Sequence, residues 1–282
     1  MAGQPAVGRD AVRRGFSPLV WLGLAAGAVL MVFPVYWMLA TALRPRPEIF
    51  AALPGLLPRA ATAGNFDAIL RRTPLLAWAG NSLFIAVIGV GITVSANLLC
   101  GYTFAKFRFP GRDVLFFLIL GAIIVPIQVI MVPEFLIVSA LGLLNSPWGV
   151  ILPRAAEAFG IFMVRQFMVS IPDELLEAAR LDGLGEFRIF LRIVLPLSKP
   201  VIAVLVIFTF MWRWNDFAWP LVVLTDHDQY TLPLGLNLLR SETNPEWGQI
   251  MALALVALAP MLAVFLVFQR FLVQGIASTG LK

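Results

Sequence analysis

Few side chains in this sequence can do covalent or metal chemistry. Among 282 residues there is one histidine, His227, and one cysteine, Cys100. The run Asp226-His227-Asp228 is a weak metal candidate, because a lone histidine without a nearby cysteine rarely forms such a site. The apolar segments hold no nucleophile–base pair, and the chain lacks the G-x-x-x-x-G-K-[ST] motif that cradles phosphates. The sequence therefore predicts no enzyme, no metal site and no cofactor in this chain.

Two pairs of opposite charges lie inside apolar segments. Arg154 precedes Glu157 by three residues, and Arg213 precedes Asp216 by the same spacing, so each pair would share one face of a continuous helix. Charged groups in a membrane span usually face the bundle interior or an aqueous cavity. The favoured interpretation is that Arg154 forms an ion pair with Glu157 and that Arg213 forms one with Asp216, the latter near the outer end of its span. The alternatives are a gating or inter-subunit role for Arg154 and Glu157, and an outer-vestibule lining by Arg213, Asn215 and Asp216.

A proline in another apolar segment raises a similar question. If Pro126 breaks its helix, Gln128 would lie beside a path for a solute. A simple proline kink is the favoured interpretation. Gln128 is therefore a fourth candidate for the path lining.

The composition requires a membrane setting for these charges. The chain is 60% apolar and 13% charged, whereas soluble domains are about 45–50% apolar and about 25% charged. The net charge of +5 comes mainly from short segments between apolar runs, so the positive-inside bias explains it better than nucleic-acid binding does. The sequence predicts an all-α integral membrane protein in a lipid bilayer.

The apolar runs predict six transmembrane helices, since about 20 apolar residues cross a bilayer. A cytoplasmic tail (1–15) precedes a transmembrane domain (16–282), whose spans are expected at about 19–43, 78–104, 114–139, 148–168, 200–224 and 248–269. The predicted cytoplasmic segments hold 13 Lys and Arg residues and the outer loops hold six, which places both termini in the cytoplasm. The outer loops are 44–74, with a short helix near 65–71, and 225–247.

A charged segment, 170–199, interrupts these spans between the fourth and the fifth. Pro172 suits the first turn of a helix, and Ser170-x-x-Asp173 resembles a capping box. Gly183 is expected to end this helix in a left-handed conformation. A second short helix is expected from about Glu186 to Val194, with Pro196 as its stop.

The first helix of this segment carries features that local stability does not require. Asp173 and Glu177 are like charges four residues apart, which costs roughly 0.2–0.5 kcal/mol. Ala178 and Ala179 form a small pair that would let another surface approach closely. An exposed acid beside a flat patch suits a basic partner. The alternative is a solvated pair of helices at the membrane interface.

The spacing of these residues resembles a known signature. Glu177-Ala178-Ala179, Gly183 six positions after Glu177, and Ile193-x-Leu195-Pro196 match every defined position of the EAA signature of permease subunits of bacterial ABC importers. The resemblance implies a type I importer permease fold, in which 170–199 is a coupling loop that docks into a cleft of an ATPase subunit, with Glu177 against a basic residue. The implied coupling residues are Glu177, Ala178, Ala179, Asp182, Gly183, Ile193, Leu195 and Pro196.

Further motifs are similar to the carbohydrate-importer branch, and within it to the second permease subunit of the maltose type. They are Asn81-Ser82-Leu83, Trp214-Asn215-Asp216-Phe217, Trp219-Pro220-Leu221 and the closing segment 275–282. The resemblance implies an ATP-driven importer in a bacterial cytoplasmic (inner) membrane that moves a sugar or sugar-like solute. Glycerol phosphate or a glycerophosphodiester is the alternative solute, and a secondary transporter is a less favoured class.

The resemblance also implies partners. A homologous second permease would complete the path, and a dimer of ATPase subunits would hold ATP and Mg. An extracytoplasmic solute-binding protein would deliver the solute, with 225–247 as its candidate docking loop.

Overall fold

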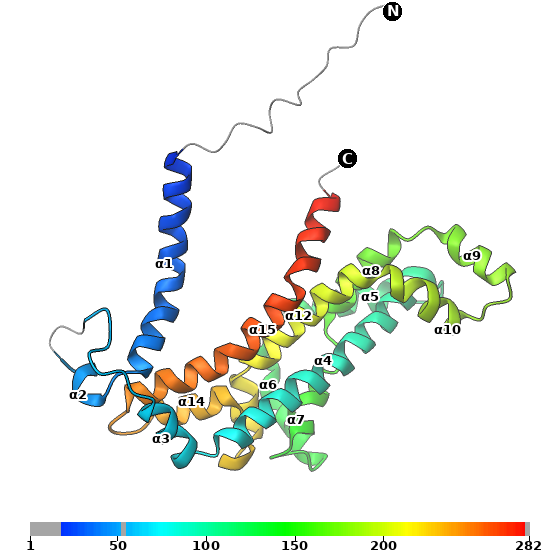
Figure 1. Ribbon diagram of the computed structural model, residues 1–282. Coiled ribbons are helices and arrows are strands. Elements are labelled where there is room, and N and C mark those ends of the chain that lie inside the picture. Colours follow the sequence, from blue (N-terminus) through cyan, green and yellow to red (C-terminus); the bar gives the residue numbers. More distant parts are fainter. Residues whose placement is uncertain (1–17, 52–54, 280–282) are drawn as a thin grey trace, which may run out of the picture.

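The computed structural model describes residues 18–51 and 55–279, and every regular element in that part of the chain is a helix (Figure 1). The predicted tail 1–15 and residues 280–282 lie outside the described residues. In chain order the helices are α1 (Pro18–Ala42), α2 (Arg46–Ile49), α3 (Gly64–Arg72), α4 (Leu75–Lys106), α5 (Arg112–Ile124), α6 (Ile127–Ala140), α7 (Pro147–Ile151), η2 (Leu152–Arg154), α8 (Ala158–Val169), α9 (Asp173–Leu181), α10 (Glu186–Ile189), η3 (Phe190–Val194), α11 (Leu195–Leu197), α12 (Lys199–Asn215), α13 (Ala218–Val223), η4 (His227–Gln229), α14 (Leu232–Arg240) and α15 (Trp247–Thr279). The predicted all-α fold is confirmed.

Three helices are long and apolar enough to cross a membrane on their own. They are α1, α4 and α15, which correspond to the predicted spans 19–43, 78–104 and 248–269. In Figure 1, α1 begins and α15 ends on the side where α9 and α10 lie, while α2, α3 and α14 lie at the opposite side.

The other three predicted spans are interrupted. α5 and α6 meet at 107°, because Val125 and Pro126 are both extended and a residue before proline disfavours the helical conformation. The expected simple kink at Pro126 is therefore wrong, and the helix breaks. A second break lies between η2 and α8, where Glu157 is extended. A third lies between α12 and α13, where Asp216 is extended. Two bent pairs of helices are each long and apolar enough for one span, namely α5 with α6 and residues Glu186–Leu197 with α12. With each of these pairs counted as one span, the described helices supply up to five spans, and α8 is a shorter apolar helix.

The 32-residue helix α4 organises the bundle, and at 1.5 Å per residue it is about 48 Å long. Gly89, Thr93, Asn97 and Gly101 follow one another at intervals of four, and all are buried. This stripe of small and polar side chains lets neighbouring helices approach, as is common inside membranes. A Cβ on Gly101 would lie 2.4 Å from Cγ1 of Val164 on α8, so the two helices are in direct contact there.

The N-terminal end of α4 holds the loop 225–247 in place. The Trp78 indole donates to the His227 carbonyl at 2.7 Å, and the Asn81 amide donates to the Asp228 carbonyl at 2.8 Å. Ser82 Oγ accepts a hydrogen bond from the Leu232 amide at 2.8 Å. The Asn81-Ser82 motif therefore has a structural role, because it fixes the path of the loop across α4.

Candidate functional site

The charged segment 170–199 forms two helical pieces joined at Gly183. Gly183 has φ +79°, the left-handed conformation that glycine adopts with least strain. The Leu184 amide donates to the Ala179 carbonyl at 3.0 Å, and the Gly183 amide donates to the Arg180 carbonyl at 3.0 Å. These two bonds form a Schellman motif. The predicted helix end at Gly183 is confirmed.

Two local predictions for this segment are wrong. Ser170 does not cap α9, because its hydroxyl donates to the Phe167 carbonyl at 2.6 Å, and Pro172 is the residue that precedes the helix. Pro196 does not stop the second piece, which continues to Leu197 and bends by 79° at the break before Lys199. The π-type turn η3 directly precedes α11, and a widened turn accommodates a residue that has no N–H.

The outward face of α9 combines acidic and apolar side chains. Glu177, Ala178 and Asp182 are exposed, and Leu181 is 89% exposed. Phe187, on the following helix α10, is 68% exposed. Ala179 is buried, so only one member of the expected Ala-Ala pair is available to a partner. Of the other implied coupling residues, Gly183 and Pro196 are exposed, whereas Ile193 and Leu195 pack against the core.

A buried lysine ties α9 to α4. Lys106, at the end of α4, donates from Nζ to the Ile171 carbonyl at 2.5 Å and to Asp173 Oδ1 at 2.6 Å. The Lys106 side chain is only 4% exposed, so its hydrogen bonds are partly shielded from solvent. The start of α9 therefore has a fixed position relative to α4.

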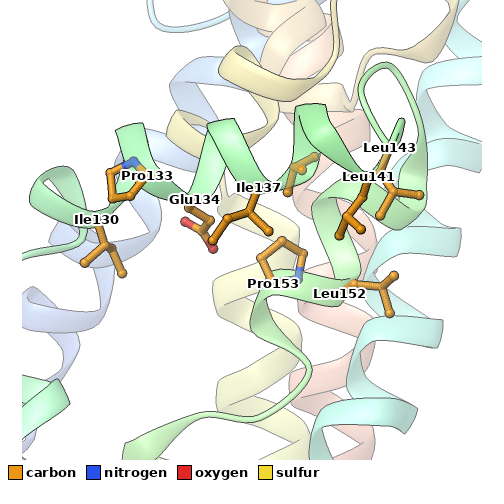
Figure 2. Close-up of a pocket in the computed structure, with 9 residues that line it drawn as sticks. Ile130, Pro133, Glu134, Ile137, Leu141, Leu143, Leu152 and Pro153 are labelled. Carbon is orange, nitrogen blue, oxygen red and sulfur yellow. The ribbon is translucent and has the colours of Figure 1, made fainter.

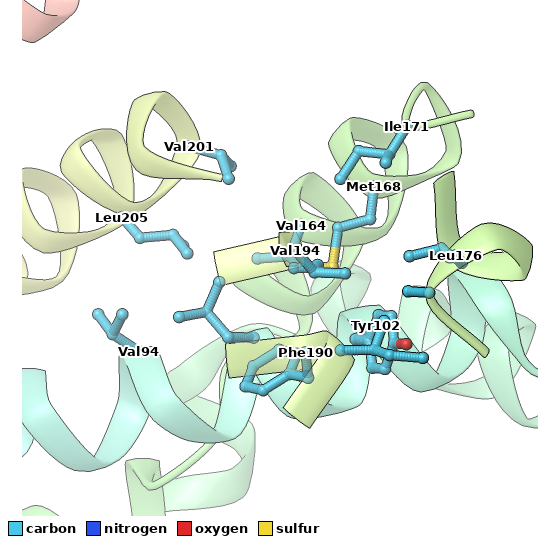
Figure 3. Packing of buried hydrophobic residues seen from close by; sticks show 13 residues of the cluster. Val94, Tyr102, Val164, Met168, Ile171, Leu176, Phe190, Val194, Val201 and Leu205 are labelled. Carbon is cyan, nitrogen blue, oxygen red and sulfur yellow. The ribbon is translucent and has the colours of Figure 1, made fainter. Parts of the chain in front are cut away.

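A second contact fixes the other end of the loop. Arg180 donates to Glu186 Oε1 at 2.6 Å, and the Tyr102 hydroxyl of α4 donates to Glu186 Oε2 at 3.3 Å. Beneath these polar contacts, Leu176 packs into a cluster with Tyr102 and Met168 (Figure 3). The two helical pieces and the end of α4 thus form one packed unit.

Acidification is expected to loosen α9 from α4. The hydrogen bond from Lys106 lowers the pKa of Asp173 below its usual range, so the folded protein binds this proton less tightly than an unfolded chain does. The stabilisation is complete above the ordinary Asp pKa of about 4 and is lost as the pH falls below it, through the folded-state value. A nitroxide on Leu181→Cys, in a Cys100→Ser background, should become more mobile over that range in electron paramagnetic resonance spectra.

Lys106→Met is the matched control for this pH experiment. Its label should already be mobile at neutral pH, and the acid-induced change should be smaller, because the partner of Asp173 is gone. An acid transition of unchanged size in Lys106→Met would show that another group holds α9.

A second candidate site lies where the three helix breaks meet. It is a pocket of about 460 Å³ lined by Ile127, Arg154, Glu157, Met211, Trp212, Arg213, Asn215 and Asp216. Ile127 opens α6, Arg154 and Glu157 flank the break before α8, and Asn215 and Asp216 flank the break after α12. Three of the four candidate path-lining residues therefore come together. Gln128 does not line this pocket, although its neighbour Ile127 does.

Neither predicted ion pair forms. Among the described residues, no salt bridge joins Arg213 to Asp216 or Arg154 to Glu157. Arg213 instead donates to Thr93 Oγ1 at 2.7 Å and to the Arg154 carbonyl. The spacing of three residues pairs side chains only on a continuous helix, and here a helix ends between or beside the members of each pair.

Glycine at position 89 makes room for Arg213. A Cβ there would lie 2.6 Å from Arg213 Cδ, closer than van der Waals contact allows. Arg213 therefore packs against the middle of α4. The sequence analysis predicts it near the outer end of its span, and this prediction is wrong. Its side chain is 7% exposed, and its Nε has no hydrogen-bond partner among the described residues.

A neighbouring pocket has a different character. It measures about 490 Å³ and is lined almost entirely by apolar side chains of α6 and of the segment around η2. Figure 2 shows its one carboxylate, Glu134, between α6 and the segment that carries Pro153. With a single charged group and no arginine in its lining, this pocket offers few polar contacts to a solute.

Lys106 and Thr93 are not among the residues that the sequence analysis predicts as functional. Nothing near Lys106 in the sequence points to Asp173, which lies 67 positions away. Thr93 could have been found, because the four-residue spacing of Gly89, Thr93, Asn97 and Gly101 is visible in the sequence.

Comparison with known proteins identifies relatives along nearly the whole chain. The family model of binding-protein-dependent transport system inner membrane components matches residues 97–278. The arabinooligosaccharides transport system permease protein AraQ of Halalkalibacterium halodurans is 34% identical over 278 residues, 96% of this chain and 100% of that protein. The sn-glycerol-3-phosphate transport system permease protein UgpE of Yersinia pestis is 36% identical over 276 residues, 95% of this chain and 98% of that protein. The crystal structure of a bacterial ABC transporter involved in the import of the acidic polysaccharide alginate contains a chain of the same fold, with a TM-score of 0.82 at 23% identity over 95% of this chain and 99% of that one.

Proposed function

Because this chain belongs to the family of binding-protein-dependent transport system inner membrane components, we propose that it is a permease subunit of an ATP-driven importer for a sugar or sugar-like solute. It is a transport subunit and not an enzyme. The importer class requires a partner permease, an ATPase and a binding protein. The motor is a separate polypeptide, because this chain carries no phosphate-binding loop of the Walker type.

The exposed face of α9 is the observation that carries the proposal. It presents Glu177 and Asp182 together with Leu181, and Phe187 of the adjoining α10 is also largely exposed. Acidic groups around exposed apolar side chains suit a basic cleft on a protein partner. We assign this face to the ATPase subunit, with Glu177 opposite a basic residue and Gly183 as the bend between the two helical pieces.

The mechanism follows from the rigid attachment of α9. ATP binding closes a dimer of ATPase subunits, and the cleft that holds α9 moves with it. Lys106 and Tyr102 tie the loop to α4, so the displacement passes into α4 and the helices packed on it. The path then changes from inward-open to outward-open, and a loaded binding protein releases its solute into it. In this orientation both ends of the chain are cytoplasmic, in the inner membrane of a bacterium.

The loop 225–247 is the docking site that we propose for the binding protein. It lies at the opposite end of α4 from the coupling face and is held there by Trp78 and Asn81. A binding protein that presses on this loop would therefore act on the same helix as the ATPase does.

The relatives support two solute classes. AraQ belongs to an arabinooligosaccharides transport system, and UgpE to an sn-glycerol-3-phosphate transport system. We propose a sugar for this chain, with glycerol phosphate or a glycerophosphodiester as the second candidate.

Reconstitution tests the function directly. Proteoliposomes that contain this chain, its partner permease and the ATPase subunits should hydrolyse ATP faster when the loaded cognate binding protein is added. They should accumulate the solute only when ATP is present on the side of the membrane where the ATPase subunits lie. A thermal-shift screen of the binding protein against sugars and glycerophosphodiesters identifies the solute. Solute accumulation without any ATPase subunit would support a secondary transporter instead and would overturn the proposal.

A further inference from the structure

The pocket at the three helix breaks has the features of a solute-contact site within this chain. We propose that a neutral, hydroxyl-rich solute binds there during translocation, so that this subunit touches the solute itself and disfavours anionic solutes. The inference rests on the proposed import function and adds the chemical class of the solute and the residues that meet it.

The first support is the convergence of irregular backbone. The breaks after Val125, before Glu157 and at Asp216 come from three different predicted spans, yet all three contribute to one pocket. Non-helical backbone at membrane depth is tolerated only inside protein or beside a water-filled cavity. Interrupted helices are also where membrane transporters of other classes hold their substrates.

The second support is depth. Arg213 packs against Gly89 and Thr93, which lie near the middle of the 32-residue helix α4. If α4 crosses the bilayer, the pocket lies close to the midplane, away from both membrane surfaces. A solute that crosses this subunit's side of the path would pass this level.

The third support is unused hydrogen-bonding capacity. The Nε atoms of Arg213 and Arg154 are both buried and have no hydrogen-bond partner among the described residues. These two atoms are covered by protein, so the accessible hydrogen-bonding capacity lies in the Glu157 and Asp216 carboxylates, which line the pocket. A hydroxyl group of a solute can donate to these carboxylates.

The charges argue against a phosphate. Two arginines, Arg154 and Arg213, and two carboxylates, Glu157 and Asp216, line the pocket. With all groups ionised the cluster has no excess positive charge, and anion sites usually need one. A balanced set of arginine donors and carboxylate acceptors suits the hydroxyls of a neutral sugar, each of which can donate and accept.

Aromatic side chains complete the site. Trp212 lines the pocket and is 56% exposed, and the Phe159 ring lies 6.3 Å from it, centroid to centroid. Together they offer an apolar surface on which the non-polar face of a sugar ring can lie. This combination of apolar walls and a few polar groups is typical of small-molecule sites.

Protection of a cysteine label tests the site in the complete importer. Asn215→Cys in a Cys100→Ser background, with otherwise cysteine-free subunits, is labelled with a maleimide while the importer turns over with its binding protein. The probes are arabinotriose, maltotriose and glycerol 3-phosphate, together with any solute that the binding protein carries in a thermal-shift screen. A neutral oligosaccharide at ten times its half-saturating concentration should slow labelling about tenfold, as expected for occupancy. Ala60→Cys, exposed in the segment between α2 and α3, is the control and should label at an unchanged rate.

Each result decides the proposal. Protection by a neutral oligosaccharide at position 215 and not at position 60 supports it. Protection by glycerol 3-phosphate alone overturns the solute class, and no protection by the solute that the binding protein carries overturns the contact.

Stimulation of ATP hydrolysis by the binding protein is measured in the same samples. If stimulation persists without protection, only this inference fails. If stimulation and ATP-dependent uptake are both absent, the proposed function fails.

Discussion

Replacing Glu177 by lysine is expected to abolish the stimulation of ATP hydrolysis by the loaded binding protein while leaving the permease folded. Glu177 is exposed in the middle of α9 and forms no salt bridge among the described residues. A charge reversal there places like charges at the proposed contact with the ATPase. One such mismatch costs several kcal/mol, and each 1.4 kcal/mol weakens the contact about tenfold. Co-purification of the ATPase subunit and hydrolysis rates in proteoliposomes are the measurements.

Glu174→Lys separates docking from helix stability. Glu174 is also exposed, but it lies in the first turn of α9, where an acid stabilises the helix by interaction with its dipole. Its reversal should therefore weaken the helix by about 0.3–1 kcal/mol and reduce coupling only modestly. Equal losses in the two variants would show that the acids of α9 serve helix stability, and full coupling in Glu177→Lys would remove the coupling assignment.

The parts of the fold that the sequence predicts correctly depend on local signals. The uninterrupted apolar runs of α1, α4 and α15 can be predicted from hydropathy. The helix end at Gly183 can be predicted because a left-handed conformation is required there and glycine adopts it easily. The coupling segment is readable because its residues fall within about 25 positions of one another. In each case the physical cause and its sequence signal occupy the same stretch of chain.

The errors arise where distant residues decide the structure. Lys106 reaches Asp173 across 67 positions, and Arg213 reaches Thr93 across 120. Once those contacts form, Arg213 no longer needs Asp216 as its partner. The paired charges were also expected on continuous helices, and this assumption failed at the breaks. The pocket therefore contains most of the expected residues, although they are held by contacts that no local pattern specifies.

Gly101→Leu is expected to have the largest effect on stability, because Gly101 sets the distance between α4 and α8. A Cβ on Gly101 would lie 2.4 Å from Val164 Cγ1 and 2.6 Å from Val164 Cβ, whereas carbon atoms in contact lie about 3.5–4.0 Å apart. Val164 is fully buried, so the helices themselves must separate. Overpacking of this kind costs about 1–3 kcal/mol and more when the backbone has to move. The yield of monodisperse protein and its melting temperature in detergent should both fall.

Gly91→Leu is the matched control for this change, since it adds the same side chain to the same helix. No described atom lies within 4 Å of a Cβ at position 91, so the variant should resemble the wild type. If Gly91→Leu loses as much stability as Gly101→Leu, close packing against Val164 is not the cause, and neither is helix propensity, which favours leucine over glycine at both positions. If only Gly101→Leu loses stability, the close contact between α4 and α8 is what stabilises the fold. That contact then fixes the break before Glu157 and the start of α9 relative to α4. The pocket and the coupling face then depend on the same close approach, which explains how movement at one can reach the other.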